Sequence, residues 1–195
     1  PICGRWADEQ PRQRHLTHDY WLFNNHHVKG ELCSSFSFSG PDNTNEFAKM
    51  TILIRPLRDN DEAQWRALWS AYLAFYETEV APEIYASTFG RLTDPARPTQ
   101  RCMVAETGDE LVGLVHIIYH PHNWHLGDVC YLQDLFVSPT MRGTGIGRML
   151  IEAVYRDADE NGAPSVYWLT QDFNHQARHL YDRIATLTPF VKYAR

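Results

Sequence analysis

Three glycines alternate with other residues in Met141-Arg142-Gly143-Thr144-Gly145-Ile146-Gly147-Arg148-Met149-Leu150. An apolar run typical of a strand, residues 131–137, precedes this stretch, and apolar residues then recur at helical spacing. A strand, a glycine loop and a helix N-terminus together form a phosphate site, because glycine lets the backbone approach a ligand and the helix dipole favours negative charge. The stretch therefore predicts a ligand that carries a pyrophosphate, with a tight turn without any ligand as the alternative.

The spacing of these glycines excludes two common phosphate loops. A dinucleotide fingerprint requires G-x-G-x-x-G, and the sixth position counted from Gly143 is Arg148. A Walker A loop requires a Gly-Lys pair, and the sequence contains none. The remaining pattern, Arg142 to Gly147, matches [Q/R]-x-x-G-x-[G/A].

This pattern resembles the acyl-CoA pyrophosphate loop of the GNAT superfamily of N-acetyltransferases. The resemblance implies acetyl-CoA as cosubstrate, with its pyrophosphate on the backbone of Arg142, Gly143, Thr144, Gly145, Ile146, Gly147 and Arg148. The run before the loop resembles a family strand whose bulge frees backbone groups for the pantetheine arm and the thioester carbonyl. The resemblance thus implies cofactor contacts from the backbone of Leu135, Phe136 and Val137, whose side chains read as ordinary buried strand.

A second signature, N-x-x-A-x-x-L-Y, runs from Asn174 to Tyr181 after another strand-like run. In the family, the tyrosine lies near the thioester sulfur and acts as general acid, and the asparagine contacts the cofactor. The resemblance implies these roles for Tyr181 and Asn174. A core position remains the alternative for Tyr181, and a helix N-cap for Asn174. The family's common Y-x-x-x-G-F is absent, and the longer turn here resembles a subgroup with histone- and small-amine-acetyltransferase relatives.

Candidate acceptor residues lie in two places. Polyamine acetyltransferases carry two acidic residues where this chain has Gln133 and Asp134, so only Asp134 matches. We expect Asp134 to bind the amine or relay its proton through water, with a hydrogen-bonded strand residue as the alternative. Glu77 and Glu79 belong to an acidic cluster between two expected helices, where family members bind the acceptor. A solvated charge run is the alternative for these glutamates.

Four histidines, at positions 116, 120, 122 and 125, crowd the segment before the 131–137 strand. No cysteine or carboxylate cluster completes a tetrahedral set with them in sequence, and acetyl transfer needs no metal. We therefore expect no metal. A histidine near the acceptor remains a candidate general base.

The composition limits the class of protein. With 195 residues, 44% of them hydrophobic, the chain can bury the core of one domain. The net charge of −6 argues against nucleic acid as a partner. No run approaches the roughly 18 apolar residues of a membrane span. The four cysteines form no CxxC pair, and we expect Cys102 and Cys130 to be buried thiols in a reducing, cytoplasmic compartment.

The pattern of apolar residues changes abruptly near Met50, because residues 1–49 lack the helical or strand periodicity that follows. We expect residues 1–49 to be an extension outside the domain, added by cloning or read from an upstream frame, with a native, poorly packed extension as the alternative. Residues 50–195 form the expected domain. Strands are expected at 51–57, 101–106, 111–119, 131–137, 165–170 and 189–193, and helices at 65–76, 82–92, 146–154 and 174–184. This order resembles the GNAT fold, an α/β (α+β) domain whose central mixed, mostly antiparallel sheet is flanked by helices.

The sequence thus predicts an acetyl-CoA-dependent N-acetyltransferase in which a small primary amine, an amino acid or a polyamine-like molecule attacks the thioester directly. A lysine acetyltransferase acting on basic protein tails is one alternative, and a non-catalytic acyl-CoA-binding module is another. Dimerisation is common in the family, so a homodimer is compatible with the resemblance, although no feature of the sequence proves it.

Overall fold

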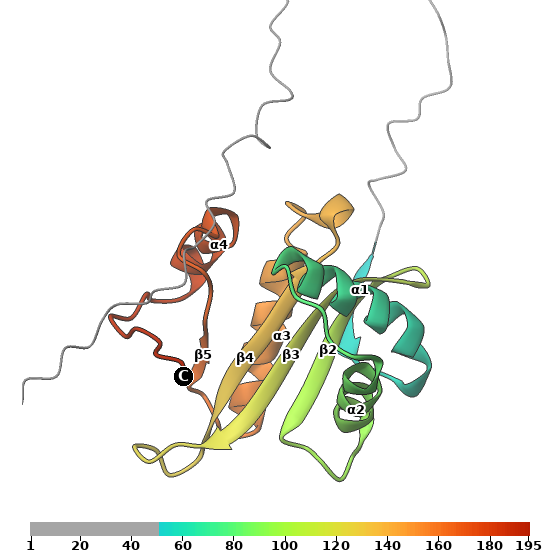
Figure 1. Cartoon of the computed structure of the whole chain (residues 1–195). Helices are drawn as coiled ribbons and strands as arrows, with labels where there is room; N and C mark the ends of the chain where they lie inside the picture. Colours follow the sequence, from blue (N-terminus) through green and yellow to red (C-terminus); the bar gives the residue numbers. More distant parts are fainter. Residues whose placement is uncertain (1–50) are drawn as a thin grey trace, which may run out of the picture. The chain divides into compact units, whose positions relative to one another are not determined.

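The computed structural model describes residues 51–195, and the expected extension over residues 1–49 lies outside the described residues. Helices and strands follow one another in the predicted order as far as the last helix (Figure 1). Their bounds are β1 (Ile52–Pro56), η2 (Asp59–Asp61), α1 (Glu62–Phe75), α2 (Pro82–Thr93), β2 (Gln100–Thr107), β3 (Glu110–Pro121), β4 (Asp128–Val137), η3 (Pro139–Met141), α3 (Ile146–Glu160), β5 (Val166–Trp168) and α4 (His175–Ile184).

Within the described residues, the strands form one sheet in the order β1-β2-β3-β4-β5. Neighbours from β1 to β4 are antiparallel, whereas β5 runs parallel to β4. The parallel step follows from the connection, because α3 must return the chain to the end of the sheet where β4 began. The prediction of a mixed, mostly antiparallel sheet flanked by helices is confirmed.

The two faces of the sheet carry separate cores. On one face, Trp65 and Trp69 of α1 and Phe89 of α2 pack against β2, β3 and β4. On the other face, α3 buries Leu150 and Val154. The buried residues of α1 and of α3 recur at three- and four-residue spacing, so each of these helices presents an apolar stripe to the sheet. Figure 1 shows α1 and α2 on one side of the sheet and α3 on the other.

The neighbouring strands β4 and β5 diverge beyond a short paired region. They pair only from Cys130 to Leu132 on β4, so the segment 133–137 has no strand beside it on the β5 side. A bulge opposite His116 and Ile117 gives β4 one extra residue, Gln133, and bends the strand where the divergence begins. An opening therefore lies between the end of β4 and α4.

The C-terminal segment corrects two predictions. Residues 189–193 are not a strand, and the strand predicted over 165–170 shortens to β5. The outer edge of the sheet offers only the three residues of β5 to a further strand, and Pro189 has no N–H to donate to a ladder. Phe190 and Tyr193 are exposed rather than packed in the core.

The remaining physical predictions concern thiols and membranes. Cys102 and Cys130 are buried and free, as predicted. No helix within residues 51–195 has both the length and the apolar character that crossing a bilayer demands.

Candidate active site

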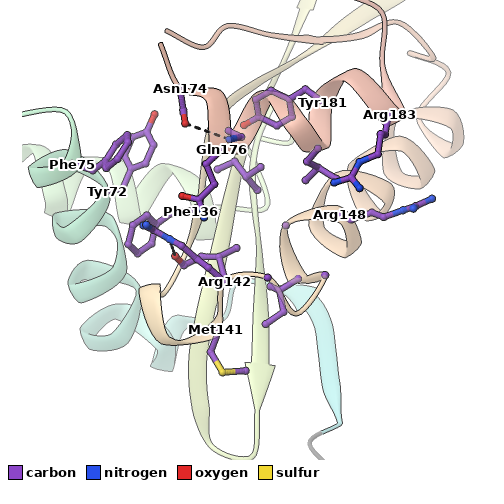
Figure 2. A pocket seen from close by; sticks show the side chains of 18 of the residues that line it. Tyr72, Phe75, Phe136, Met141, Arg142, Arg148, Asn174, Gln176, Tyr181 and Arg183 are labelled. Carbon is purple, nitrogen blue, oxygen red and sulfur yellow. Dashed lines mark hydrogen bonds between the residues drawn. The ribbon is translucent and has the colours of Figure 1, made fainter. Parts of the chain in front are cut away.

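A cavity of about 430 Å³ occupies the opening between β4 and α4 (Figure 2). Its walls come from four places that lie far apart in the sequence. They are the end of α1 with Tyr72, the segment 135–137 of β4, the glycine loop with the start of α3, and one face of α4 with Tyr181. The glycine loop therefore faces a cavity instead of ending in a closed turn.

The loop needs glycine at two of its positions. Gly143 has φ 79° and Gly145 has φ 91°, values at which any side chain is strained. Gly145 is also the N-cap of α3, and its first helical bond is donated by Met149 N–H at 3.0 Å. The N–H groups of residues 146–148 have no partner within the helix and no capping side chain. They are free to bind an anion.

The charge lining the cavity is opposite to that of the whole chain. Arg142, Arg148 and Arg183 line the cavity, and no Asp or Glu does so among the described residues. The Arg142 guanidinium lies 5.7 Å from the centre of the Phe136 ring, and its Nε donates to Val137 O at 3.2 Å. These contacts hold one cation beside the loop. The cavity fits an anionic ligand with an apolar section.

Tyr181 and Asn174 face this cavity from α4 and its N-terminus. The Asn174 side chain caps the helix by accepting Ala177 N–H at 3.4 Å, so the N-cap reading of this residue is correct. The ring of Tyr181 lies 5.3 Å from that of Trp168. Burial, followed by the proximity of Tyr76, raises the pKa of Tyr181 to about 12. The hydroxyl is therefore protonated at neutral pH.

Asp134 lies behind the cavity wall, 7% exposed, and does not line the cavity itself. His116 Nδ1 lies 2.8 Å from its Oδ2, and Trp69 Nε1 donates to the same oxygen at 3.2 Å. Trp65 Nε1 donates to His116 Nε2 at 2.9 Å. The predicted candidate base is thus bound to the one predicted histidine that is buried.

The predicted site residues separate into two groups. All the predicted cofactor residues line the cavity except Thr144, whose Oγ1 donates to Met141 O at 2.7 Å. Of the predicted acceptor residues, Gln133, Glu77 and Glu79 are exposed and do not line it. Within residues 51–195, no group of three or more His, Cys, Asp or Glu side chains is placed to hold a metal.

Several cavity residues were not predicted to be functional, among them Tyr72, Tyr76, Met141 and Gln176. Tyr72 and Tyr76 read in sequence only as the inward face of a helix. Their position at the end of α1, where the helix passes the edge of the sheet, has no sequence signal. Cys130 is not a candidate nucleophile, because burial raises the pKa of its thiol to about 11.

The comparison with known families agrees with this geometry. The model of the acetyltransferase (GNAT) family matches residues 62–185, which is more than half of the chain. The chain belongs to the GNAT family. Its GNAT domain contains both elements that the family signatures predicted, the glycine loop and the helix with Tyr181.

Curated relatives of this GNAT domain are N-acetyltransferases. The D-amino-acid N-acetyltransferase HPA3 of Saccharomyces cerevisiae (strain ATCC 204508 / S288c) is 40% identical over 146 residues, which cover 74% of this chain and 90% of that protein. A thialysine N-epsilon-acetyltransferase of Sus scrofa is 34% identical over 90 residues, covering 46% of this chain and 48% of that protein. The GNAT domain is therefore that of an N-acetyltransferase.

Solved structures show the same fold at lower identity. A ribosomal-protein-alanine N-acetyltransferase from Brucella melitensis biovar Abortus 2308 has a TM-score of 0.61 at 20% identity, covering 74% of this chain and 98% of that one. The aminoglycoside N-acetyltransferase AAC(6')-Iy, solved with CoA, has a TM-score of 0.66 at 17% identity, covering 75% and 95%. At these identities the likeness concerns the GNAT fold alone.

Proposed function

We propose that this GNAT domain transfers the acetyl group of acetyl-CoA to the primary amine of a small molecule, by direct attack of the amine on the thioester. The observation that carries the proposal is the cavity between β4 and α4. It combines unpaired N–H groups at the start of α3, arginine side chains and an apolar wall on β4. A pyrophosphate joined to a long, largely apolar arm fits this combination.

The roles of the cofactor residues follow from their positions. The N–H groups at the start of α3 bind the pyrophosphate, and Arg142 neutralises its charge. Arg148 also lines the cavity, but its guanidinium pairs with Glu152 at 2.7 Å. The unpaired edge of β4 from 135 to 137 offers backbone groups to the pantetheine arm and to the thioester carbonyl. Asn174 lies at the far end of the same cavity, where it contacts the cofactor.

Two residues move protons in the proposed reaction. The free amine attacks the carbonyl carbon and the N–C bond forms. The C–S bond then breaks, the sulfur leaves as a thiolate, and the amide nitrogen releases its second proton, which returns through solvent to Tyr181 once that residue has protonated the sulfur. Tyr181 donates its proton to this sulfur, because a protonated hydroxyl in the cavity is the acid that the leaving group needs. Asp134 takes up the proton that the ammonium form of the substrate must lose before it can attack.

The relatives suggest the class of acceptor. Those named above are described as acting on D-amino acids and on thialysine, and both are small amines that also carry a carboxylate. We propose an amino acid of this kind as the acceptor. The acidic cluster of Glu77 and Glu79 is exposed outside the cavity, so the polyamine reading has no support from charge at the cavity wall.

A turnover screen tests the proposal. Release of CoA from acetyl-CoA is measured with D-amino acids, their L-enantiomers, thialysine, spermidine, an aminoglycoside and a lysine-rich peptide. We expect the highest kcat/KM with a D-amino acid or thialysine. A preference for the peptide would favour the lysine acetyltransferase instead. CoA binding without turnover of any amine would leave the non-catalytic acyl-CoA-binding module.

A further inference from the structure

The carboxylate of Asp134 is enclosed by groups that direct its proton chemistry. Trp65 Nε1 can only donate, so the Nε2 of His116 that faces it at 2.9 Å must accept. The proton of the neutral ring is then on Nδ1, which donates to Asp134 Oδ2 at 2.8 Å. Trp69 donates to the same oxygen at 3.2 Å. His116 therefore holds Asp134 in place and has no free nitrogen to accept a proton from it.

The arrangement leaves Asp134 without direct access to an acceptor amine. It is 7% exposed and lies outside the lining of the cavity, so a substrate in the cavity does not touch it. A base in this position works only through an intermediate group that reaches both the carboxylate and the cavity.

Tyr72 is placed to be that group. It lies three residues after Trp69 on α1, hence on the helix face that reaches Asp134. It also lines the cavity, where Figure 2 shows it beside Phe75 and across from Tyr181 and Asn174. Its ring packs edge-to-face against Tyr76 at 5.0 Å and against Phe136 at 6.4 Å, so its position is set by aromatic contacts on two sides.

We propose that Tyr72 is a catalytic proton relay between the acceptor amine and Asp134. This inference rests on the proposed acetyl transfer. The Tyr72 oxygen accepts a proton from the bound ammonium group while its own hydroxyl proton passes to Asp134. The ammonium becomes a free amine and Asp134 becomes a carboxylic acid, with no change in total charge. The proton returns to solvent by the reverse route after product leaves.

The electrostatics of the surroundings favour a relay over a tyrosinate base. Burial, and then the charge and hydrogen bond of Asp134, raise the pKa of Tyr72 well above its ordinary value. Tyr72 therefore remains protonated and can only exchange one proton for another. Among the titratable groups near Asp134, His116 contacts it directly, and burial together with the negative charge of Asp134 raises the pKa of Tyr72, Tyr76, Tyr131 and Cys102. These tyrosine and cysteine side chains therefore carry their protons near neutral pH.

The pH dependence of a single variant tests the relay. The kcat/KM of the unsubstituted protein and of Tyr72→Phe is measured from pH 6 to pH 9 with thialysine and with a D-amino acid. Without a relay, the enzyme must capture amine that is already deprotonated, a fraction that rises tenfold per pH unit below an amine pKa of roughly 10. We expect Tyr72→Phe to lower kcat/KM about 100-fold at pH 7, with the deficit shrinking about tenfold per pH unit above it.

A matched control is available in Tyr85→Phe. Tyr85 packs edge-to-face on Trp69 at 5.2 Å, but its hydroxyl accepts from Ser70 Oγ at 2.9 Å and it does not line the cavity. We expect its kcat/KM to stay within about twofold of the unsubstituted protein at every pH. A deficit in Tyr72→Phe that does not change with pH means that Tyr72 only supports the structure, and overturns the inference.

Two further measurements keep the test decisive. Circular dichroism and acetyl-CoA affinity establish that Tyr72→Phe is folded. If it is not, the solvent isotope effect on kcat/KM of the unsubstituted protein at pH 7 replaces it. The kcat/KM is measured in mixtures of H2O and D2O. A quadratic dependence of kcat/KM on the deuterium fraction of the solvent supports the transfer of two protons in one step, and a linear dependence contradicts the relay. Absence of turnover in the unsubstituted protein with every amine overturns the proposed function as well, whereas turnover with a pH-independent deficit overturns the relay alone.

Discussion

Tyr181 carries its proton near neutral pH. A tyrosine hydroxyl is already protonated there, and burial raises the pKa of Tyr181 further, to about 12, so the side chain can act as an acid and not as a base. A hydroxyl that lines the proposed acetyl-CoA cavity can protonate a leaving thiolate, which is the acid step that amine acetylation requires.

Replacing Tyr181 by phenylalanine tests this role. We expect Tyr181→Phe to lower kcat at least tenfold, because the thiolate must then leave without a proton, and to change the Kd of acetyl-CoA little. Tyr155→Phe is the control, because Tyr155 also lies near Trp168, at 6.5 Å, but donates to Ile184 O instead of lining the cavity. Stopped-flow turnover and calorimetric binding give the two values. Unchanged turnover would assign Tyr181 to the core only.

Arg55 and Asp61 form a buried ion pair between β1 and η2. The guanidinium donates to the two carboxylate oxygens of Asp61 at 2.6 and 3.0 Å, and it also pairs with Glu106. Burial by itself would raise the pKa of Asp61. Hydrogen bonds from Arg55 and from the Arg58 backbone lower the pKa by more than burial raises it, so the pKa lies below its ordinary value. The stabilisation is thus present above the unfolded pKa near 4 and is lost as the pH falls through the folded pKa.

We expect Asp61→Asn to lower the free energy of unfolding by roughly 3 kcal/mol at pH 7, because Arg55 then remains buried without one of its partners. The difference from the unsubstituted protein should shrink at pH 3, because pH 3 lies below the unfolded pKa and unfolding then takes up a proton at Asp61. Urea denaturation at the two pH values measures this. Asp59→Asn, an exposed neighbour in η2, is the control and should change stability little. A deficit as large at pH 3 as at pH 7 would contradict the pKa direction.

The glycine loop and α3 act as one element. Gly145 caps the helix in the left-handed region, whereas Gly147 lies within the helix. A Cβ on Gly147 would meet Leu180 Cδ2 at 3.6 Å and Val137 Cγ2 at 3.8 Å, which are ordinary contacts. The backbone conformation therefore requires glycine at position 145, whereas neither the backbone conformation nor the available space requires it at position 147.

We expect Gly145→Ala to destabilise the protein by about 1–2 kcal/mol, because alanine is strained at that φ. Gly147→Ala should be neutral or stabilising by up to about 1 kcal/mol, because alanine favours the helix. Thermal denaturation of the two variants side by side separates these effects. Equal destabilisation by both substitutions would mean that steric closure of the loop, and not backbone conformation, selects glycine.

At the scale of the whole domain, α4 is held loosely. It has no fully buried residue, and β5, which leads to it, pairs with β4 over only three residues. The proposed acetyl-CoA site spans the opening, since β4, the glycine loop and α4 line the same cavity. A ligand there joins two parts of the domain that have few contacts of their own.

We therefore expect acetyl-CoA to slow amide hydrogen exchange in α4 and at the start of α3, and to leave the β2–β3 hairpin unchanged. At a concentration 100 times Kd, the ligand should also stabilise the fold by about 2.7 kcal/mol. Hydrogen-exchange mass spectrometry with and without acetyl-CoA measures both regions. Protection confined to the hairpin would place the ligand elsewhere.

The periodicity of apolar residues predicted the helices and strands that pack through one apolar stripe, such as α3 and the strand before it. The spacing of the glycines predicted the loop residues that line the cavity. The prediction of a last strand over residues 189–193 was wrong because a strand needs the free edge of another strand to pair with, and no local pattern in the sequence encodes that edge. Thr144 fits the family motif, and the role predicted for it belongs to its backbone. Its hydroxyl donates to Met141 O, a contact that the motif does not predict.

Local sequence was sufficient to predict the strand, glycine loop and helix start of the proposed phosphate site, because these elements are contiguous in the chain. The surroundings of Asp134 depend on the packed domain. Trp69 and Tyr72 on α1 and His116 on β3 converge on that carboxylate from elements far apart in the chain. Burial by α1 separates Asp134 from the cavity, so a residue that read as a substrate contact is proposed to act through its neighbour instead.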